Sequence, residues 1–103
     1  WLERWRTDQV TGLEVWRERR FAVVIGNDLM NGTFDRVVLG YDAAGKLVRA
    51  DILDFKTDRL ADDLEREERR GFYQPQLEAY ARALGRLTGL DAGSIQTELV
   101  WIN

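Results

Sequence analysis

The chain of 103 residues contains neither cysteine nor histidine. Without cysteine it forms no disulfide and offers no thiolate ligand to a metal ion. Without histidine it lacks both the imidazole general base and the imidazole ligand that zinc sites use. Any chemistry must therefore use carboxylates, Lys, Arg, Tyr, Ser and Thr, and any metal site must be built from oxygen ligands.

Long apolar runs are also missing. No apolar segment approaches the ~20 residues that span a bilayer, and the N-terminus, WLERWRTD, is aromatic and charged, unlike a secretory signal. We therefore expect a cytoplasmic protein with no membrane contact. The length predicts a single domain over residues 1–103. Because the chain opens on Trp1 and not on methionine, we expect it to be a piece excised from a longer protein.

Positive charge is in slight deficit, with a formal net charge of −3. This balance argues mildly against a protein that coats nucleic acid, which is expected to be basic. Arginines cluster in residues 17–20 and 66–70, where the simplest interpretation is a solvated, salt-bridged face. Lysine is rare, with two residues against thirteen arginines, and Lys56 follows Asp54 by two positions in the segment ADILDFKTD.

The distribution of apolar residues predicts three strands, a helix and a fourth strand. Short connections between the first three strands predict an antiparallel meander, so the expected fold class is mixed α/β. The charged segment 58–71 predicts a loop or a weakly packed helical segment, and residues 1–8 predict the end of another helix. The expected strands are residues 13–25, 29–41, 46–57 and 93–103, and the expected helix is 73–89.

The expected helix has signals at both ends. Pro75 suits its first turn and Gly89 its C-terminal cap. Apolar residues recur at helical spacing and predict the face that is buried. They are Leu77, Tyr80, Ala81, Leu84 and Leu87. On the second strand, Gly32 indicates a bulge or a close backbone approach.

Strand alternation places Asp54 and Lys56 on one face of the third strand. In an antiparallel pair joined through residues 40–46, Asp35 falls roughly opposite residues 51–55, where Cβ atoms of facing residues lie about 4.5–5.5 Å apart. Two converging, half-buried carboxylates repel each other unless a cation lies between them. Oxygen ligands favour a hard ion such as Mg²⁺ or Mn²⁺. A lysine beside such an ion orients water and stabilises charge on a phosphate, which fits phosphodiester hydrolysis.

In combination, these segments resemble the PD-(D/E)xK nuclease domains at the C-terminal ends of RecB- and AddA-type helicase–nucleases. The matching segments are NGTFDRVVL, DILDFKTD and YQPQLEAYARAL, and their order and spacing follow the family over residues 14–103. The resemblance implies a small restriction-endonuclease-like core and a Mg²⁺-dependent deoxyribonuclease of exonuclease type, working in bacterial DNA repair. It also implies DNA, in particular single-stranded ends, as substrate, and the helicase domains of the parent chain or complex as partners.

The resemblance also assigns roles by position. The implied catalytic residues are Asp35, Asp54, Lys56, Gln76 and Tyr80, and the implied metal ligands are Asp35, Asp54 and the backbone carbonyl of Phe55, with Glu18 as a further candidate. RecB-like members usually add a histidine from an upstream helix, which this chain lacks. No Walker-type GxxxxGK[ST] segment occurs, so a motor would lie outside this piece.

Two other interpretations stay open. One is a degenerate nuclease fold that only binds DNA or a partner protein; the intact set of Asp35, Asp54 and Lys56 disfavours it, because binding alone has no physical need for that set. The other is an unrelated α/β interaction module, which would be supported if Asp35 and Lys56 faced opposite sides of the sheet. Gln76 also fits an exposed helix residue, and Glu18 fits a charged surface run.

Overall fold

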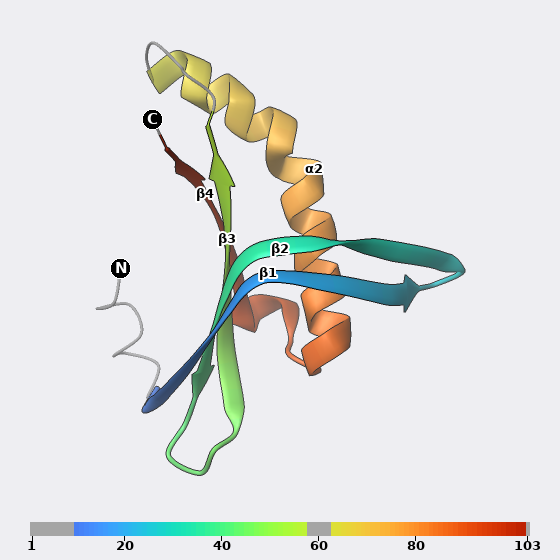
Figure 1. The fold of residues 1–103 in the computed structure, drawn as a ribbon, viewed down its shortest axis with the longest axis vertical. Coiled ribbons are helices and arrows are strands. Elements are labelled where there is room, and N and C mark those ends of the chain that lie inside the picture. The colour runs from blue at the N-terminus through green and yellow to red at the C-terminus, as the bar shows by residue number, and fades with distance from the viewer. Residues whose placement is uncertain (1–9, 58–62, 103) are drawn as a thin grey trace.

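The computed structural model describes residues 10–57 and 63–102, which form a four-stranded sheet with the helix α2 against one face (Figure 1). The elements are β1 (Gly12–Ile25), β2 (Asp28–Tyr41), β3 (Leu47–Lys56), α2 (Asp63–Thr88), the 3₁₀ turn η1 (Ala92–Ser94) and β4 (Ile95–Trp101). The sheet order is β1-β2-β3-β4; the first three strands are antiparallel and β4 is parallel to β3. The predicted meander, helix and further strand are confirmed. The helix end expected at residues 1–8 lies outside the described residues.

The core lies between the sheet and α2 and is centred on three aromatic rings. Phe21 of β1 stacks on Phe34 of β2 with 4.3 Å between ring centroids, and Tyr80 of α2 meets both rings edge-on. Aliphatic residues of all four strands and of α2 complete this core. They include Val23, Val37, Leu39, Ala50, Ile52, Ala83, Leu84 and Ile95.

The buried face of α2 differs in part from the predicted one. Leu77 and Leu84 are buried as expected, but Leu87 is 46% exposed. The prediction for Leu87 was wrong because three turns of helix after Leu77 lead to Thr88, which takes the inward position in the last turn. The Thr88 hydroxyl donates to the Leu84 carbonyl at 2.7 Å. The predicted cap at Gly89 is confirmed, with φ of 79° and its N–H donating to the Gly85 carbonyl at 2.8 Å.

Helix α2 extends into the charged segment before residue 73, where it is mostly exposed; of the two alternatives predicted for that segment, the weakly packed helix is confirmed. It starts at Asp63, so Pro75 lies in the interior of α2 and not in its first turn. The Glu- and Arg-rich segment that precedes Pro75 contains strong helix formers, and Asp63 and Glu65 favour the positive end of the helix dipole. Proline removes one backbone hydrogen bond and bends a helix, and α2 is bent along its length (Figure 1). Nowhere in residues 10–57 and 63–102 is a helix both long and apolar enough to cross a membrane.

The β1–β2 hairpin bends where Glu18 faces Asp35. The strand register pairs Arg17 with Arg36 and Arg19 with Phe34, which leaves Glu18 and Asp35 opposite each other, and Glu18 has a positive φ of 48°. On β2 the core-facing positions change from Phe34 to Val37, an odd interval that breaks strict alternation. Beyond this bend the outer half of the hairpin crosses α2 (Figure 1).

Gly32 marks the closest approach of this outer half to its neighbours. A Cβ atom at Gly32 would lie 3.0 Å from Phe21 Cζ and 3.5 Å from Tyr80 Cε1, so the predicted close approach is confirmed. Because the Phe21 ring is held by Phe34, we expect Gly32→Ala to lower the free energy of unfolding by roughly 1–3 kcal/mol in urea denaturation. Gly71→Ala, in open space on α2, should instead raise it by roughly 0.5–1 kcal/mol. Equal stability of the two variants would contradict this packing.

Candidate active site

The C-terminal end of β3 carries an acid and a base on the face toward α2. The side chains of Asp54 and Lys56 are 8% and 17% exposed, and Lys56 Nζ lies 3.1 Å from Asp54 Oδ2. Strand alternation places both residues on one face, as predicted, and rules out the arrangement in which a helix would separate them. The carboxylate and the ammonium are thus held side by side in a largely buried position.

Asp35 reaches this point from the neighbouring strand. The β2–β3 pairing ends at Arg36 and Leu53, and one further step of that register places Asp35 opposite Asp54, within the predicted range of residues 51–55. Past this pair β2 bends away, so the Phe55 N–H has no backbone partner on β2 and is satisfied by Asp35 Oδ2 at 2.9 Å. Asp35 therefore bridges the point where β2 and β3 separate, beyond Arg36 and Leu53, which we call the fork. Its side chain lies against the Asp54 carboxyl.

Burial of Asp54 shifts its protonation equilibrium. Desolvation raises the pKa of the Asp54 carboxyl above its ordinary value, the Asp35 carboxyl raises it further, and Lys56 lowers it without cancelling the rise. Asp54 Oδ2 is also buried and accepts no hydrogen bond of good geometry, although the Lys56 ammonium is near. Two acids and one lysine thus leave an excess of negative charge at a partly buried position, which a cation would relieve.

Two polar residues of α2 extend the site. Lys56 Nζ donates to Gln76 Oε1 at 3.3 Å, and Gln76 Nε2 donates to the Tyr80 hydroxyl at 3.3 Å. Gln76 and Tyr80 are four residues apart and so lie on one side of the helix, one turn from each other. The chain from Lys56 through Gln76 to Tyr80 joins the sheet to the helix and fixes the direction of the ammonium group.

Three further residues at the site were not assigned to it from the sequence. The Tyr73 ring lies 4.2 Å from Lys56 Nζ, Trp101 pairs with Lys56 across β3 and β4, and the Arg36 guanidinium lies 5.1 Å from the Phe55 ring. The spacing of Tyr73, three residues before Gln76, indicated a shared helix face. That signal was missed because Tyr73 was expected to begin the helix. Nothing in the sequence alone pairs Trp101 with Lys56, since the parallel register is set by tertiary packing.

Glu18 lies near this constellation but apart from its buried pair. Its side chain is exposed, and it borders a hollow of about 510 Å³ together with Arg17, Asp35, Arg36 and Phe55. The hollow opens beside Asp35, and Lys56 does not border it. Glu18 is thus placed near Asp35 without joining the contact between Asp35 and Asp54, and its role as a ligand stays a prediction.

The donor atoms at the site are of the kind that a hard divalent cation binds, but they are fewer than such an ion needs. Within residues 10–57 and 63–102 there is no group of three or more acidic side chains arranged to hold a metal ion. The fork offers two carboxylates, one with an oxygen that accepts no hydrogen bond, and the Phe55 carbonyl. Because Lys56 O accepts from Ile102 N on the β4 side, the Phe55 carbonyl points to the opposite side, toward Asp35. These oxygens suit Mg²⁺ or Mn²⁺, with water completing the coordination.

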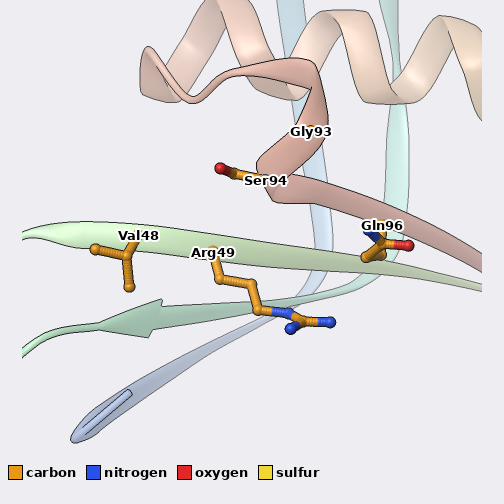
Figure 2. A pocket seen from close by; sticks show the side chains of 5 residues that line it. All are labelled: Val48, Arg49, Gly93, Ser94 and Gln96. Carbon is orange, nitrogen blue, oxygen red and sulfur yellow. The ribbon is translucent and has the colours of Figure 1, made fainter. Parts of the chain in front are cut away.

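A separate polar hollow lies at the other end of β3. Figure 2 shows its lining residues, with Val48 and Arg49 on β3 and Ser94 and Gln96 across from them. Its volume is about 380 Å³, and none of the predicted site residues borders it. Arg49 Nε lies 3.6 Å from Asp51 Oδ1 on the same strand. The hollow is therefore distinct from the Asp54–Lys56 site.

Comparison with known proteins bears on this geometry. A family model described as the PD-(D/E)XK nuclease superfamily matches residues 1–102. Comparison with curated proteins and with solved structures gave no match. The match covers nearly the whole chain, including both strands of the fork and the helix that contacts Lys56.

Proposed function

The chain belongs to the PD-(D/E)XK nuclease superfamily, and we propose that it is the nuclease part of a RecB- or AddA-like helicase–nuclease of bacterial DNA repair. In this proposal it hydrolyses DNA phosphodiesters as a Mg²⁺- or Mn²⁺-dependent exonuclease acting on single-stranded ends. The helicase domains of the parent chain or complex would be its partners.

One observation carries the proposal: Lys56 is held at the point where Asp54, Asp35 and Gln76 converge. Lys56 lies 3.1 Å from Asp54 and 3.3 Å from Gln76, and Asp35 binds the intervening backbone at Phe55. An unrelated interaction module has no reason to gather two acids and a lysine around one buried carboxylate, since burial of charge costs free energy. Asp35 and Lys56 also do not face opposite sides of the sheet, the arrangement that would have supported that module.

Each residue has a chemical task in this proposal. Asp35, Asp54 and the Phe55 carbonyl would hold the metal ion, which when bound lowers the pKa of a water molecule and neutralises phosphoryl oxygens. Lys56 donates hydrogen bonds to the attacking water or to a phosphoryl oxygen, and it stabilises the charge that develops there. Gln76 orients the ammonium group, and Tyr80 in turn orients Gln76.

Cleavage of an end-labelled single-stranded oligonucleotide with Mg²⁺ or Mn²⁺ tests the proposal. We expect Lys56→Ala to lower the cleavage rate by roughly 10²–10³-fold, because one preorganised donor to a developing charge contributes about that much. The matched control is Lys46→Ala, which removes the only other lysine of the chain from an exposed loop position. Lys46→Ala should cleave as wild type does.

The outcomes separate the proposal from its alternative. Equal cleavage by wild type and Lys56→Ala would indicate a contaminating nuclease and remove the assignment of Lys56. Absence of metal-dependent cleavage by every variant, with DNA binding intact, would favour the catalytically silent module. Labelling the 5′ and the 3′ end in turn distinguishes stepwise removal of terminal nucleotides from internal cuts.

A further inference from the structure

Three aromatic rings extend from Lys56 toward solvent. Trp101 lies beside Lys56 in the parallel pair of β3 and β4, on the same face of the sheet. The Tyr73 ring lies 6.2 Å from the Trp101 ring and 5.2 Å from the Phe72 ring. The rings of Trp101, Tyr73 and Phe72 thus form a continuous row that begins at the lysine.

The outer end of this row is exposed. Phe72 is 69% exposed, although a phenyl ring on a helix normally gains free energy by burial. Phe72 precedes Gln76 by four residues, so the two lie on one side of α2. The Arg69 guanidinium lies 5.9 Å from the Phe72 ring. The inner end also offers a donor, since the Trp101 Nε1–H is buried without a hydrogen-bond partner.

The charge around the row indicates what it binds. From Asp63 to Tyr73, α2 carries four acidic side chains and three arginines, so attraction for phosphates is weak along this stretch. A ligand held here must gain its free energy from the rings. Nucleobases have flat π faces that stack on aromatic side chains, and only unpaired strands expose those faces fully.

We propose that Phe72, Tyr73 and Trp101 form a stacking platform that holds nucleobases of single-stranded DNA next to the phosphate at Lys56. This inference rests on the proposed function, because it places the scissile phosphate at Lys56. It adds a binding site for bases, and it makes the preference for an unpaired strand a property of this helix. Tyr73 connects the two sites, since its ring contacts Lys56 and lies next to the rings of both Phe72 and Trp101.

Binding of two labelled strands, measured by fluorescence anisotropy in EDTA, tests the platform without cleavage. One strand is made of about ten thymidines, and the other has the same phosphates but abasic sugars. Wild type should bind the thymidine strand more tightly by roughly 5- to 150-fold, the range expected for stacking of one base. In Phe72→Ala the ratio of the affinities for the thymidine strand and the abasic strand should fall close to one, and in Phe72→Trp it should stay near the wild-type value.

Leu64→Ala is the matched control. Leu64 is also 69% exposed on α2, but it lies eight residues before Phe72, about 12 Å away along the helix axis, and so outside the row of rings. This variant should keep the wild-type ratio. Since Leu64 and Phe72 are equally exposed, a loss in both variants would indicate a general effect of apolar surface and would overturn the stacking platform.

The remaining outcomes also decide. A wild-type ratio near one, no binding of either strand, or an unchanged ratio in Phe72→Ala overturns the platform; the last would assign the exposed ring to a protein contact. Base-dependent binding without metal-dependent cleavage supports the platform and contradicts the proposed nuclease activity. Metal-dependent cleavage without base-dependent binding supports the nuclease activity and overturns the platform. The two proposals can therefore fail separately.

Discussion

Replacing Asp54 with asparagine should abolish metal-dependent DNA cleavage and, at neutral pH, make the metal-free protein more stable than wild type. Asparagine keeps the size of the side chain but removes a buried charge that lies against Asp35. Loss of a ligand should lower the cleavage rate by more than about 10³-fold, since even residues that only support a ligand account for 10–100-fold. In the proposed reaction the Asp54 carboxylate would therefore lower the stability of the fold while it supports cleavage.

The pH dependence of this difference follows from the pKa of Asp54. Burial raises this pKa, so the folded protein holds the Asp54 proton more tightly than the unfolded chain does. Folding is therefore favoured by this group at a pH below the unfolded pKa of about 3.9, and that contribution is lost as the pH rises through the higher folded pKa. The Asp54→Asn variant carries no carboxyl group at this position, so its stability does not fall as the pH rises through the folded pKa of Asp54. Its advantage in stability should be present at neutral pH and disappear in acid.

Thermal melting with and without Mn²⁺ measures both effects. In EDTA, Asp54→Asn should melt above wild type; with Mn²⁺ at 100 times its Kd, wild type should gain about 2.7 kcal/mol and the variant much less. Asp28→Asn, at the exposed start of β2, is the control and should follow wild type in both conditions. A variant that melts below wild type in EDTA would contradict the raised pKa. An equal response to Mn²⁺ would remove Asp54 from the ligand set.

The strands and the pairing of the two acids were predictable because they follow local rules. Alternation put Asp54 and Lys56 on one face, and the short turn at residues 42–45 limited Asp35 to a position near residue 53. A one-residue register shift between Gly40 and Tyr41 then brings Asp35 opposite Asp54. The turn itself is stabilised by Asp42, whose carboxylate accepts from the N–H groups of Ala44 and Lys46. Such features depend on residues close to one another in the chain, so they can be predicted from local sequence patterns.

The features that escaped prediction depend on packing between distant segments. Glu18 has no turn chemistry, yet it adopts a positive φ because the hairpin bends there to bring Phe21 onto α2. That bend directs Asp35 into the fork and frees the Phe55 N–H to bind it. The charged segment has good helix propensity but little apolar periodicity, so the sequence left it between a loop and a weakly packed helix, and its continuity with the predicted helix was missed. Tyr73 therefore appeared as a terminal residue and not as the ring beneath Lys56.

Replacing Phe34 with alanine should cause the largest loss of stability. Phe34 is fully buried, stacks on Phe21 at 4.3 Å and meets Tyr80 at 5.7 Å. Removing such a ring costs roughly 3–5 kcal/mol, a large part of the 5–15 kcal/mol typical of a whole domain. The melting temperature should fall by on the order of 15–30 °C.

Loss of the Phe34 ring should also lower the cleavage rate, through its effect on the candidate active site. Tyr80 would lose one of the two rings that hold it, and its hydroxyl orients Gln76 and hence Lys56. Urea denaturation gives the loss in free energy of unfolding, and cleavage assayed well below the new melting temperature gives the loss in rate. Leu29→Ala, on the same strand but 67% exposed, should change either value little, within about 0.5 kcal/mol of stability. If Phe34→Ala destabilised the fold but left the cleavage rate unchanged, the path from the aromatic core through Tyr80 to Lys56 would be refuted.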